Sequence, residues 1–293
     1  MQNNSTKNKF NAEFEALERQ KNVLAIHDIS CLGKCSLTVA LPIISACGHT
    51  TTVLPTAILS THTGDFTGYT FNDLTNDLIP IVNHWKTLDV HFDCIYAGYL
   101  GSIHQIDLVK QIIKMFKTPE TLVVIDPVMA DYGELYHGFD HAFAKEMATL
   151  AAVADIIVPN FTEAGLILDI PYTANPTKVE LEKLIMDLHK KTSANIVLTG
   201  VENDKNQLGA CSFNRDTNKI SYSFAEKLNK SFHGTGDIFA SALVGEMLRG
   251  KTLEEACQIA CDFTTSSAKY SMLLGSDLRF GVAFEKFLHI LNK

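Results

Sequence analysis

Residues 94–127 read CIYAGYLGSIHQIDLVKQIIKMFKTPETLVVIDP, and they contain one complete strand–helix–strand unit. The two apolar runs, Cys94–Ala97 and Leu122–Ile125, are short and rich in residues that favour strands, as expected of strands buried on both faces. Residues 104–116 between them carry apolar side chains at helical spacing. A strand, a helix and a second strand in this order predict a parallel β-α-β unit.

The same alternation continues on both sides of this unit. Further strands are expected at Val23–Ile26, Thr51–Leu54, Ile156–Val158 and Ile196–Leu198, and further helices at residues 35–47, 72–86, 137–150, 161–168, 177–191, 235–249, 253–272 and 280–291. The segments Leu208–Phe213 and Ile220–Phe224 flank a turn with Asn214, Asp216 and Asn218, which is typical of an antiparallel hairpin. The sequence therefore predicts an α/β fold: a three-layer α-β-α sandwich with a mostly parallel central sheet and an antiparallel hairpin at its C-terminal side.

No internal repeat and no linker-like stretch of Gly, Ser or Pro interrupts this series, so residues 22–293 are expected to form a single domain. Residues 1–21 form an N-terminal extension. Within it, Phe10, Phe14 and Leu17 have helical spacing, which predicts either a short helix that docks on the domain or a frayed tail.

The composition disfavours several classes of protein. Of the 293 residues, 46% are hydrophobic and 20% are charged, which excludes wholesale disorder. Lys and Arg number 25 against 33 Asp and Glu, a formal charge of −8. The phosphate backbone of DNA or RNA needs a concentrated basic face, and no run of Lys or Arg provides one, so no nucleic-acid partner is expected.

The seven cysteines are an odd number at wide spacing, which argues against a secreted disulfide framework. Cys31 and Cys35, like Cys257 and Cys261, are four residues apart, a spacing that would put each pair on one helix face. A zinc site of four thiolates is conceivable, but neither pair has the turn context of a metal knuckle. Small buried hydrophobes are the favoured interpretation.

The first 20 residues are polar and charged, without the apolar segment of a signal peptide. No apolar run approaches the ~20 residues that span a bilayer. The sequence therefore predicts a cytoplasmic protein without a membrane partner.

The sharpest local feature is the turn His233-Gly234-Thr235-Gly236-Asp237, which leads directly into an apolar run. Two glycines separated by one residue permit a tight turn whose N–H groups converge on an anion, and the helix that follows adds a favourable dipole. The local alternative is a helix cap, in which Thr235 or Asp237 satisfies free N–H groups. The turn is neither a Walker A loop nor a dinucleotide-binding fingerprint, so a nicotinamide or flavin oxidoreductase is disfavoured.

This turn and four further motifs resemble those of a known family. Gly234-Thr235-Gly236-Asp237 at the start of a late helix is similar to the motif of the ribokinase-like small-molecule kinases. Four further motifs resemble those of the vitamin B6 kinases, in that family's order and across residues 22 to about 275: His62-Thr63-Gly64 after Thr56, Ala97-Gly98-Tyr99-Leu100-Gly101-Ser102, Asp126-Pro127-Val128-Met129 and Pro159-Asn160-Phe161-Thr162-Glu163. Hydroxymethylpyrimidine kinases share three of these elements, whereas Gly-Tyr-Leu-Gly-Ser and His-Thr-Gly favour vitamin B6.

The resemblance implies ATP-dependent phosphorylation of the 5′-hydroxymethyl group of pyridoxal, pyridoxamine or pyridoxine. Asp237 would be the catalytic base, and the N–H groups of Gly234, Thr235 and Gly236 would stabilise charge on the phosphoryl oxygens.

The resemblance also implies Mg²⁺, organised by Asn160 and Glu163 mostly through water, with Asp126 near the phosphates or the metal. The structural alternative is that Asn160 and Glu163 form a capping box, and both roles can coexist. Relatives often use K⁺ as well.

On the substrate side the resemblance implies Asp28, Thr56 and His62 beside Asp237. Many pyridoxal kinases carry Ser at the position of Asp28, and an anionic side chain would suit a cationic aminomethyl group or a protonated ring nitrogen. The alternative is that Asp28 only caps the following turn. The segment from Thr63 to Gly68 is either a flap that closes on the substrate or a plain surface loop.

For the nucleotide, a groove is expected near residues 227–232, and the nucleotide-side residues are Asp126, Val158, Asn160, Glu163, Thr199, Lys230, Phe232, Gly234 and Gly236. Relatives often have Lys close to the position of Thr199, so this chain departs from them at that phosphate contact.

Three functions remain open: a vitamin B6 kinase, a hydroxymethylpyrimidine kinase, and a non-catalytic pyridoxal phosphate-binding regulator. The family commonly forms dimers, which predicts a homodimer.

Overall fold

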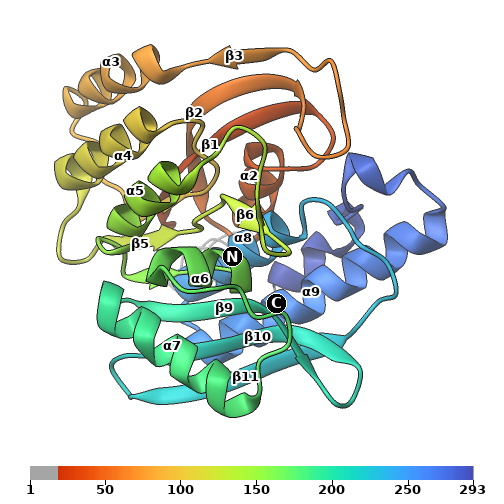
Figure 1. Ribbon diagram of the computed structural model, residues 1–293. Helices are drawn as coiled ribbons and strands as arrows, with labels where there is room; N and C mark the ends of the chain where they lie inside the picture. Colours follow the sequence, from red (N-terminus) through yellow and green to blue (C-terminus); the bar gives the residue numbers. More distant parts are fainter. Residues whose placement is uncertain (1–18, 293) are drawn as a thin grey trace, which may run out of the picture.

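A nine-stranded sheet runs through the computed structural model, which describes residues 19–292 (Figure 1). The strand order is β11-β10-β9-β8-β5-β4-β1-β2-β3. The strands from β9 to β2 pair in parallel, whereas β10 and β11 form an antiparallel hairpin at one edge and β3 pairs antiparallel with β2 at the other. The bounds are β1 (Asn22–Leu32), β2 (Thr50–Thr61), β3 (Phe71–Asp73), β4 (Cys94–Ala97), β5 (Leu122–Ile125), β8 (Ile156–Ile157), β9 (Asn195–Asn203), β10 (Gln207–Asn214) and β11 (Lys219–Glu226).

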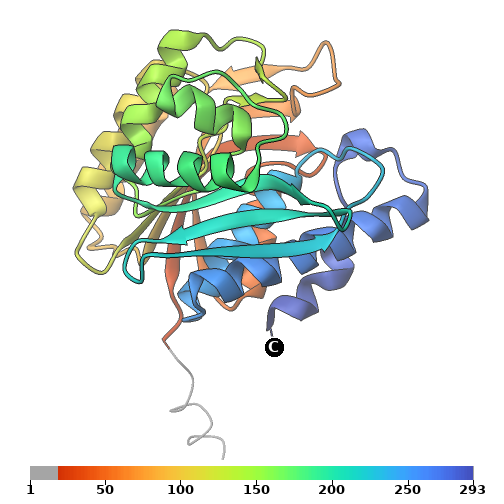
Figure 2. The ribbon, with the colours of Figure 1, turned by 60° about the horizontal axis from the view of Figure 1, so that its bottom comes forward.

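Helices cover both faces of this sheet (Figure 2). One face carries α3 (Thr75–Lys86), α4 (Ile103–Phe116), α5 (His141–Ala151), α6 (Phe161–Leu168) and α7 (Lys178–Thr192), and the other carries α2 (Leu37–Ala46), α8 (Thr235–Leu248) and α9 (Leu253–Leu274). Alternate residues of β1 enter the two cores: Leu24 and Ile26 pack in the first and Val23 in the second. The predicted three-layer α-β-α sandwich is confirmed.

Several elements differ from the prediction. β1 and β2 run on to Leu32 and Thr61, because they continue to pair with each other beyond the end of β4. Residues 71–73 form the edge strand β3, so the helix predicted from residue 72 begins at Thr75. Two 3-10 segments, Leu278–Phe280 and Glu285–Asn292, replace the helix predicted at 280–291. A small hairpin of β6 (Ala130–Asp131) and β7 (Glu134–Leu135) was not predicted.

The two cysteine pairs have different outcomes. Cys257 and Cys261 lie buried on α9, as predicted. The prediction is wrong for Cys31 and Cys35, which share no helix face: Cys31 is exposed on β1, and Cys35 is half-buried just before α2. β1 extends through Cys31, and the chain turns before Cys35.

The helix predicted around Phe10, Phe14 and Leu17 lies outside the described residues. Between residues 19 and 292, none of the helices combines the length and the apolar character that a bilayer crossing requires.

Candidate active site

The strand order reverses at β1. The chain passes from β1 to β2 and β3 and then returns to β4 on the other side of β1. Connections at such a switch point leave adjacent strands in opposite directions, which opens a crevice for ligands beyond their carboxyl ends. β4 ends at Ala97 opposite Ile26, so Asp28 lies just beyond it, and Asp126 directly follows β5.

An irregularity in the pairing of β1 with β2 lies at Asp28. His27 pairs with Pro55 and Ile29 pairs with Ile58, so two steps along β1 match three along β2. A bulge of this kind re-aims side chains and is frequent next to functional sites. Asp28 on β1 and Thr56 on β2 both lie at this irregularity, within strands that continue past the ends predicted from the sequence.

The predicted substrate-side residues are largely buried. Asp28 is 4% exposed and accepts a hydrogen bond from the hydroxyl of Ser30 at 3.0 Å. Thr56 is fully buried, and its hydroxyl donates to the carbonyl of Tyr99 at 3.4 Å. His62 is also buried, in the loop after β2. These three polar side chains therefore expose little of their surface to solvent.

The glycine turn begins α8 in a conformation that glycine favours. Gly234 has φ 76°, and a Cβ atom there would overlap the carbonyl oxygen of Lys34. At Gly236, by contrast, a Cβ would have no neighbour within 4 Å. The turn thus contacts Lys34 at Gly234 and has open space at Gly236. On the open side its N–H groups can face an anion.

The helix-cap alternative is wrong. The first turn of α8 has no side-chain cap, and the hydroxyl of Thr235 donates to the carbonyl of Phe232 at 3.4 Å instead. The Asp237 side chain reaches across to the segment before α2. Its Oδ2 atom accepts hydrogen bonds from the N–H of Ser36 at 2.9 Å and from the thiol of Cys35 at 3.2 Å.

Four carboxyl groups influence one another at this edge of the sheet. Burial raises the pKa of Asp28, Asp126, Glu163 and Asp237, and it brings that of Asp28 to about 6. Repulsion adds to burial: the charge of Asp237 raises the pKa of Asp28 and of Asp126, and the charge of Asp126 raises that of Glu163. The site can therefore bind cations and accept protons near neutral pH.

Asn160 and Glu163 form the capping box that the sequence analysis gave as the structural alternative. The Asn160 side chain accepts the N–H of Glu163 at 2.9 Å, and Glu163 accepts the N–H of Asn160 at 2.9 Å. Glu163 also accepts the N–H of Met129 at 3.2 Å, and Asn160 donates to the carbonyl of Ala130 at 2.8 Å. These bonds fix both side chains beside the segment that follows Asp126.

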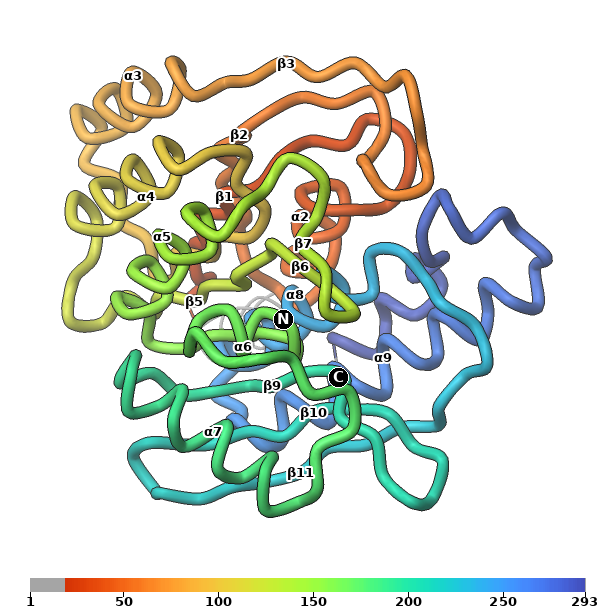
Figure 3. Tube along the Cα trace, in the orientation of Figure 1, coloured from red at the N-terminus to blue at the C-terminus, as the bar shows by residue number. Residues whose placement is uncertain are grey.

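The loop after β2 packs on two distant segments (Figure 3). His62 donates from Nε2 to the carbonyl of Arg279 at 2.6 Å and accepts the N–H of Gly64 at 3.2 Å, which together define its neutral form. The ring of Phe66 lies 5.2 Å from that of Phe280. The ring of His62 lies 5.0 Å from that of His233, directly before the glycine turn.

The remaining nucleotide-side residues are more dispersed. Thr199 on β9 donates to the carbonyl of Pro159 at 3.4 Å, next to Asn160. Val158 is 4% exposed and packs in the core with α8. Phe232 is half-buried against the same core, and Lys230 is exposed in the loop before the glycine turn.

Sequence reasoning missed Lys34, Cys35 and Ser36. They lie more than 190 residues before Asp237 in the chain, and no local pattern links the two segments. One signal was present: a polar Lys-Cys-Ser run between the first strand and its helix, at the edge where ligands bind.

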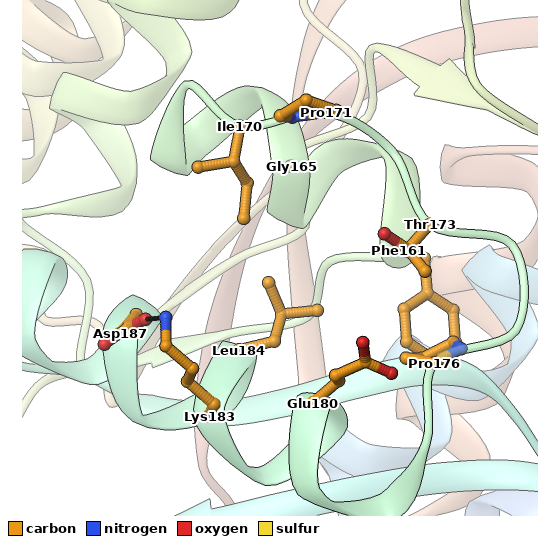
Figure 4. A pocket seen from close by; sticks show the side chains of 10 residues that line it. All are labelled: Phe161, Gly165, Ile170, Pro171, Thr173, Pro176, Glu180, Lys183, Leu184 and Asp187. Atoms are coloured by element: carbon orange, nitrogen blue, oxygen red, sulfur yellow. Dashed lines mark hydrogen bonds and ion pairs between the residues drawn. The ribbon is translucent and has the colours of Figure 1, made fainter.

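A small pocket of about 180 Å³ lies apart from the carboxyl groups, between α6, α7 and the loop that joins them (Figure 4). Phe161, Ile170 and Leu184 line it, and the ion pair of Lys183 with Asp187 lies at its side. None of the four carboxyl groups lines this pocket.

The three-layer fold is that of the ribokinase-like small-molecule kinases, and a solved pyridoxal kinase from Lactobacillus plantarum shares it. Within this class, the chain belongs to the phosphomethylpyrimidine kinase family, whose model matches residues 41–280.

The chain is also similar to individual proteins of this group. It is 38% identical to a Bacteroides thetaiotaomicron protein assigned to the phosphomethylpyrimidine kinases, with a TM-score of 0.90 and 94% of each chain covered, and another crystal form of that protein contains pyridoxal. It is 31% identical to the L. plantarum enzyme, with a TM-score of 0.86 over 93% of this chain and 97% of that one. Pyridoxal kinase from Dictyostelium discoideum is 29% identical over 191 residues, which span 61% of each protein's length.

Proposed function

We propose that this kinase transfers the γ-phosphoryl group of ATP to the 5′-hydroxymethyl group of a vitamin B6 compound. The observation that carries the proposal is the half-buried carboxylate of Asp237, which lies in the first turn of α8 beside the open face of the Gly234–Gly236 turn and makes no cap. A base and a set of anion-binding N–H groups are thereby adjacent, as phosphoryl transfer to an alcohol requires.

In the proposed reaction, Asp237 takes the proton of the acceptor hydroxyl while the hydroxyl oxygen bonds to the γ-phosphorus. The bond from that phosphorus to the bridging oxygen breaks, and ADP leaves with the electron pair. N–H groups at the start of α8 stabilise the charge on the three phosphoryl oxygens, aided by the helix dipole. The raised pKa of Asp237 makes its carboxylate a better proton acceptor than an exposed one.

The donor set suits Mg²⁺. Asp126 and Glu163 are buried, burial and the charge of Asp126 raise the pKa of Glu163, and the Asp126 side chain has no hydrogen bond among the residues that the structure describes. No group of three or more His, Cys, Asp or Glu side chains in residues 19–292 could enclose a metal, and Mg²⁺ needs only one or two carboxylates because it keeps several waters. When bound, the ion would neutralise charge on the nucleotide phosphates.

Asp28 supports a vitamin B6 acceptor. Its carboxyl is buried at the substrate end of the site, and a pKa of about 6 leaves it mostly ionised at neutral pH. A cationic aminomethyl group or a protonated ring nitrogen would relieve the repulsion between Asp28 and Asp237. Pyridoxal in a crystal of the Bacteroides relative supports the same choice.

The second candidate acceptor is hydroxymethylpyrimidine or its phosphate, favoured by the family match itself. The distinguishing experiment offers pyridoxal, pyridoxamine, pyridoxine and hydroxymethylpyrimidine separately with ATP and measures ADP formation. We expect the highest kcat/KM with a B6 compound. A preference for the pyrimidine would contradict the proposal, and tight binding of pyridoxal phosphate without any turnover would favour the regulator instead.

A further inference from the structure

Cys35 and Ser36 meet Asp237 from the segment between β1 and α2. Both donate to the same oxygen, Oδ2, from the thiol at 3.2 Å and the backbone N–H at 2.9 Å. No hydrogen bond to Oδ1 is found among residues 19–292. The carboxylate is thus held by one oxygen only.

The two donors are themselves fixed. Ser36 has φ 56°, in the left-handed region that non-glycine residues rarely adopt, and this conformation persists where surrounding structure enforces it. Thr38 accepts the N–H of Cys35 at 3.3 Å and donates to its carbonyl at 2.8 Å. Lys34, the preceding residue, donates its N–H to the carbonyl of Phe280 at 3.0 Å.

The Cys35 thiol is suited to donate rather than to attack. Burial and the nearby charges of Asp237 and Asp28 raise the pKa of this thiol well above its usual value. The sulfur therefore stays protonated, and its hydrogen points to a carboxylate oxygen, which is the better acceptor.

We infer that Cys35 is a positioning residue for phosphoryl transfer: with the N–H of Ser36 it occupies Oδ2 of Asp237, so that Oδ1 faces the acceptor hydroxyl and takes its proton. This inference rests on the proposed role of Asp237 as the base. It assigns a function in the reaction to a side chain that the sequence shows only as a small hydrophobe.

Two substitutions distinguish the effect of the thiol's hydrogen bond from the effect of the space that the thiol fills. Cys35→Ser keeps a donor of similar size, and Cys35→Val fills the space without one. We expect Cys35→Val to lower kcat about three- to ten-fold, the factor typical of one hydrogen bond, with KM for ATP and for the vitamer within about twofold. Cys35→Ser should keep kcat close to that of the wild type. Cys31→Val is the matched control, because Cys31 is exposed four residues earlier, and it should be silent.

A second measurement does not depend on activity. The infrared S–H stretching band of Cys35, isolated as the difference between wild type and Cys35→Ser, should lie at lower frequency than a free thiol and shift upward in Asp237→Ala. A band that does not shift in Asp237→Ala would overturn the inference. So would a wild-type kcat in Cys35→Val, or a rise in KM of that variant without a change in kcat. A loss of kcat in Cys35→Ser as large as in Cys35→Val would overturn it too. Absence of kinase activity from the wild type with every acceptor would instead contradict the proposed function, and the infrared shift would still test the contact.

Discussion

The Nε2 atom of His233 lies 2.8 Å from the Oδ2 atom of Asp65. This contact joins the loop after β2 to the residue that precedes Gly234, and it lowers the pKa of Asp65. The rings of His62 and Phe66 pack around it, and the guanidinium of Arg279 lies 5.5 Å from the centre of the Phe66 ring. These contacts therefore tie the loop to the Gly234–Gly236 turn.

Replacing Asp65 tests whether this loop excludes water from the phosphoryl group. Asp65→Asn removes the charge that His233 attracts, so the loop should open more often and ATP should be hydrolysed faster in the absence of an acceptor. Because the pair is exposed, the increase should be no more than about five-fold. Phosphate release without vitamer measures it, with Asp204→Asn, an exposed carboxylate in the turn between β9 and β10, as the control. Equal hydrolysis in both variants would mean that the loop does not act as a flap.

Asp237→Asn tests the catalytic base. The amide has nearly the shape of the carboxylate and can still accept the N–H of Ser36, but it cannot take up a proton. We expect kcat to fall by at least about 10²-fold, with dissociation constants for ATP and pyridoxal almost unchanged. The measurements are turnover and, by calorimetry, the two dissociation constants. Turnover above about a tenth of the wild-type value would rule out Asp237 as the catalytic base.

The two glycines of the turn should respond differently to alanine. At Gly234 the new Cβ would overlap the Lys34 carbonyl at a positive φ, so Gly234→Ala should lower the free energy of unfolding as well as activity. At Gly236 the protein leaves the space open, so Gly236→Ala should unfold at the wild-type denaturant midpoint yet bind ATP more weakly. Urea unfolding beside ATP titration distinguishes the two. Equal loss of stability in both variants would contradict an open anion-binding face at Gly236.

Asp28 makes stability depend on pH. Its pKa is about 6 in the folded protein and near 3.8 in the unfolded chain, so folding favours the protonated form. That contribution is complete below about pH 4 and is lost as the pH rises through 6. Asp28→Asn should therefore be more stable than the wild type at pH 8, by up to about 3 kcal/mol, and the difference should shrink towards pH 5. Urea unfolding at each pH measures the difference in the free energy of unfolding between the two proteins. A difference that stays constant between pH 5 and pH 8 would show that it does not come from the titration of Asp28.

The same residue should influence the choice of acceptor. Asp28→Ser removes the negative charge near the proposed ring position, so KM should rise more for pyridoxamine, with its cationic aminomethyl group, than for pyridoxine. Steady-state kinetics with each vitamer measure the ratio. An unchanged ratio would indicate that Asp28 serves only the local structure.

The sequence predicted the layers of the fold because its apolar periodicity is local. It also located Asp237 and Asp126, since a helix start and a strand end are both visible in a few residues. It could not place the contact of Cys35 with Asp237, which depends on how segments far apart in the chain fold together. The same holds for Gly98, visible as part of a motif, where a Cβ would overlap the buried ring of His27 on the neighbouring strand.

Lys34 lies against both Gly234 and Gly281, and its N–H donates to the carbonyl of Phe280. Lys34 thus supports one face of the Gly234 turn and is itself held by the segment around Phe280, so three segments far apart in the chain meet here. All the strands of the main sheet precede residue 280 in the chain, so they can pair before the segment around residue 280 closes on Lys34. We therefore expect the Gly234 turn to reach its final position late in folding, and a protease cut just before residue 280 to loosen this turn before it disturbs the sheet.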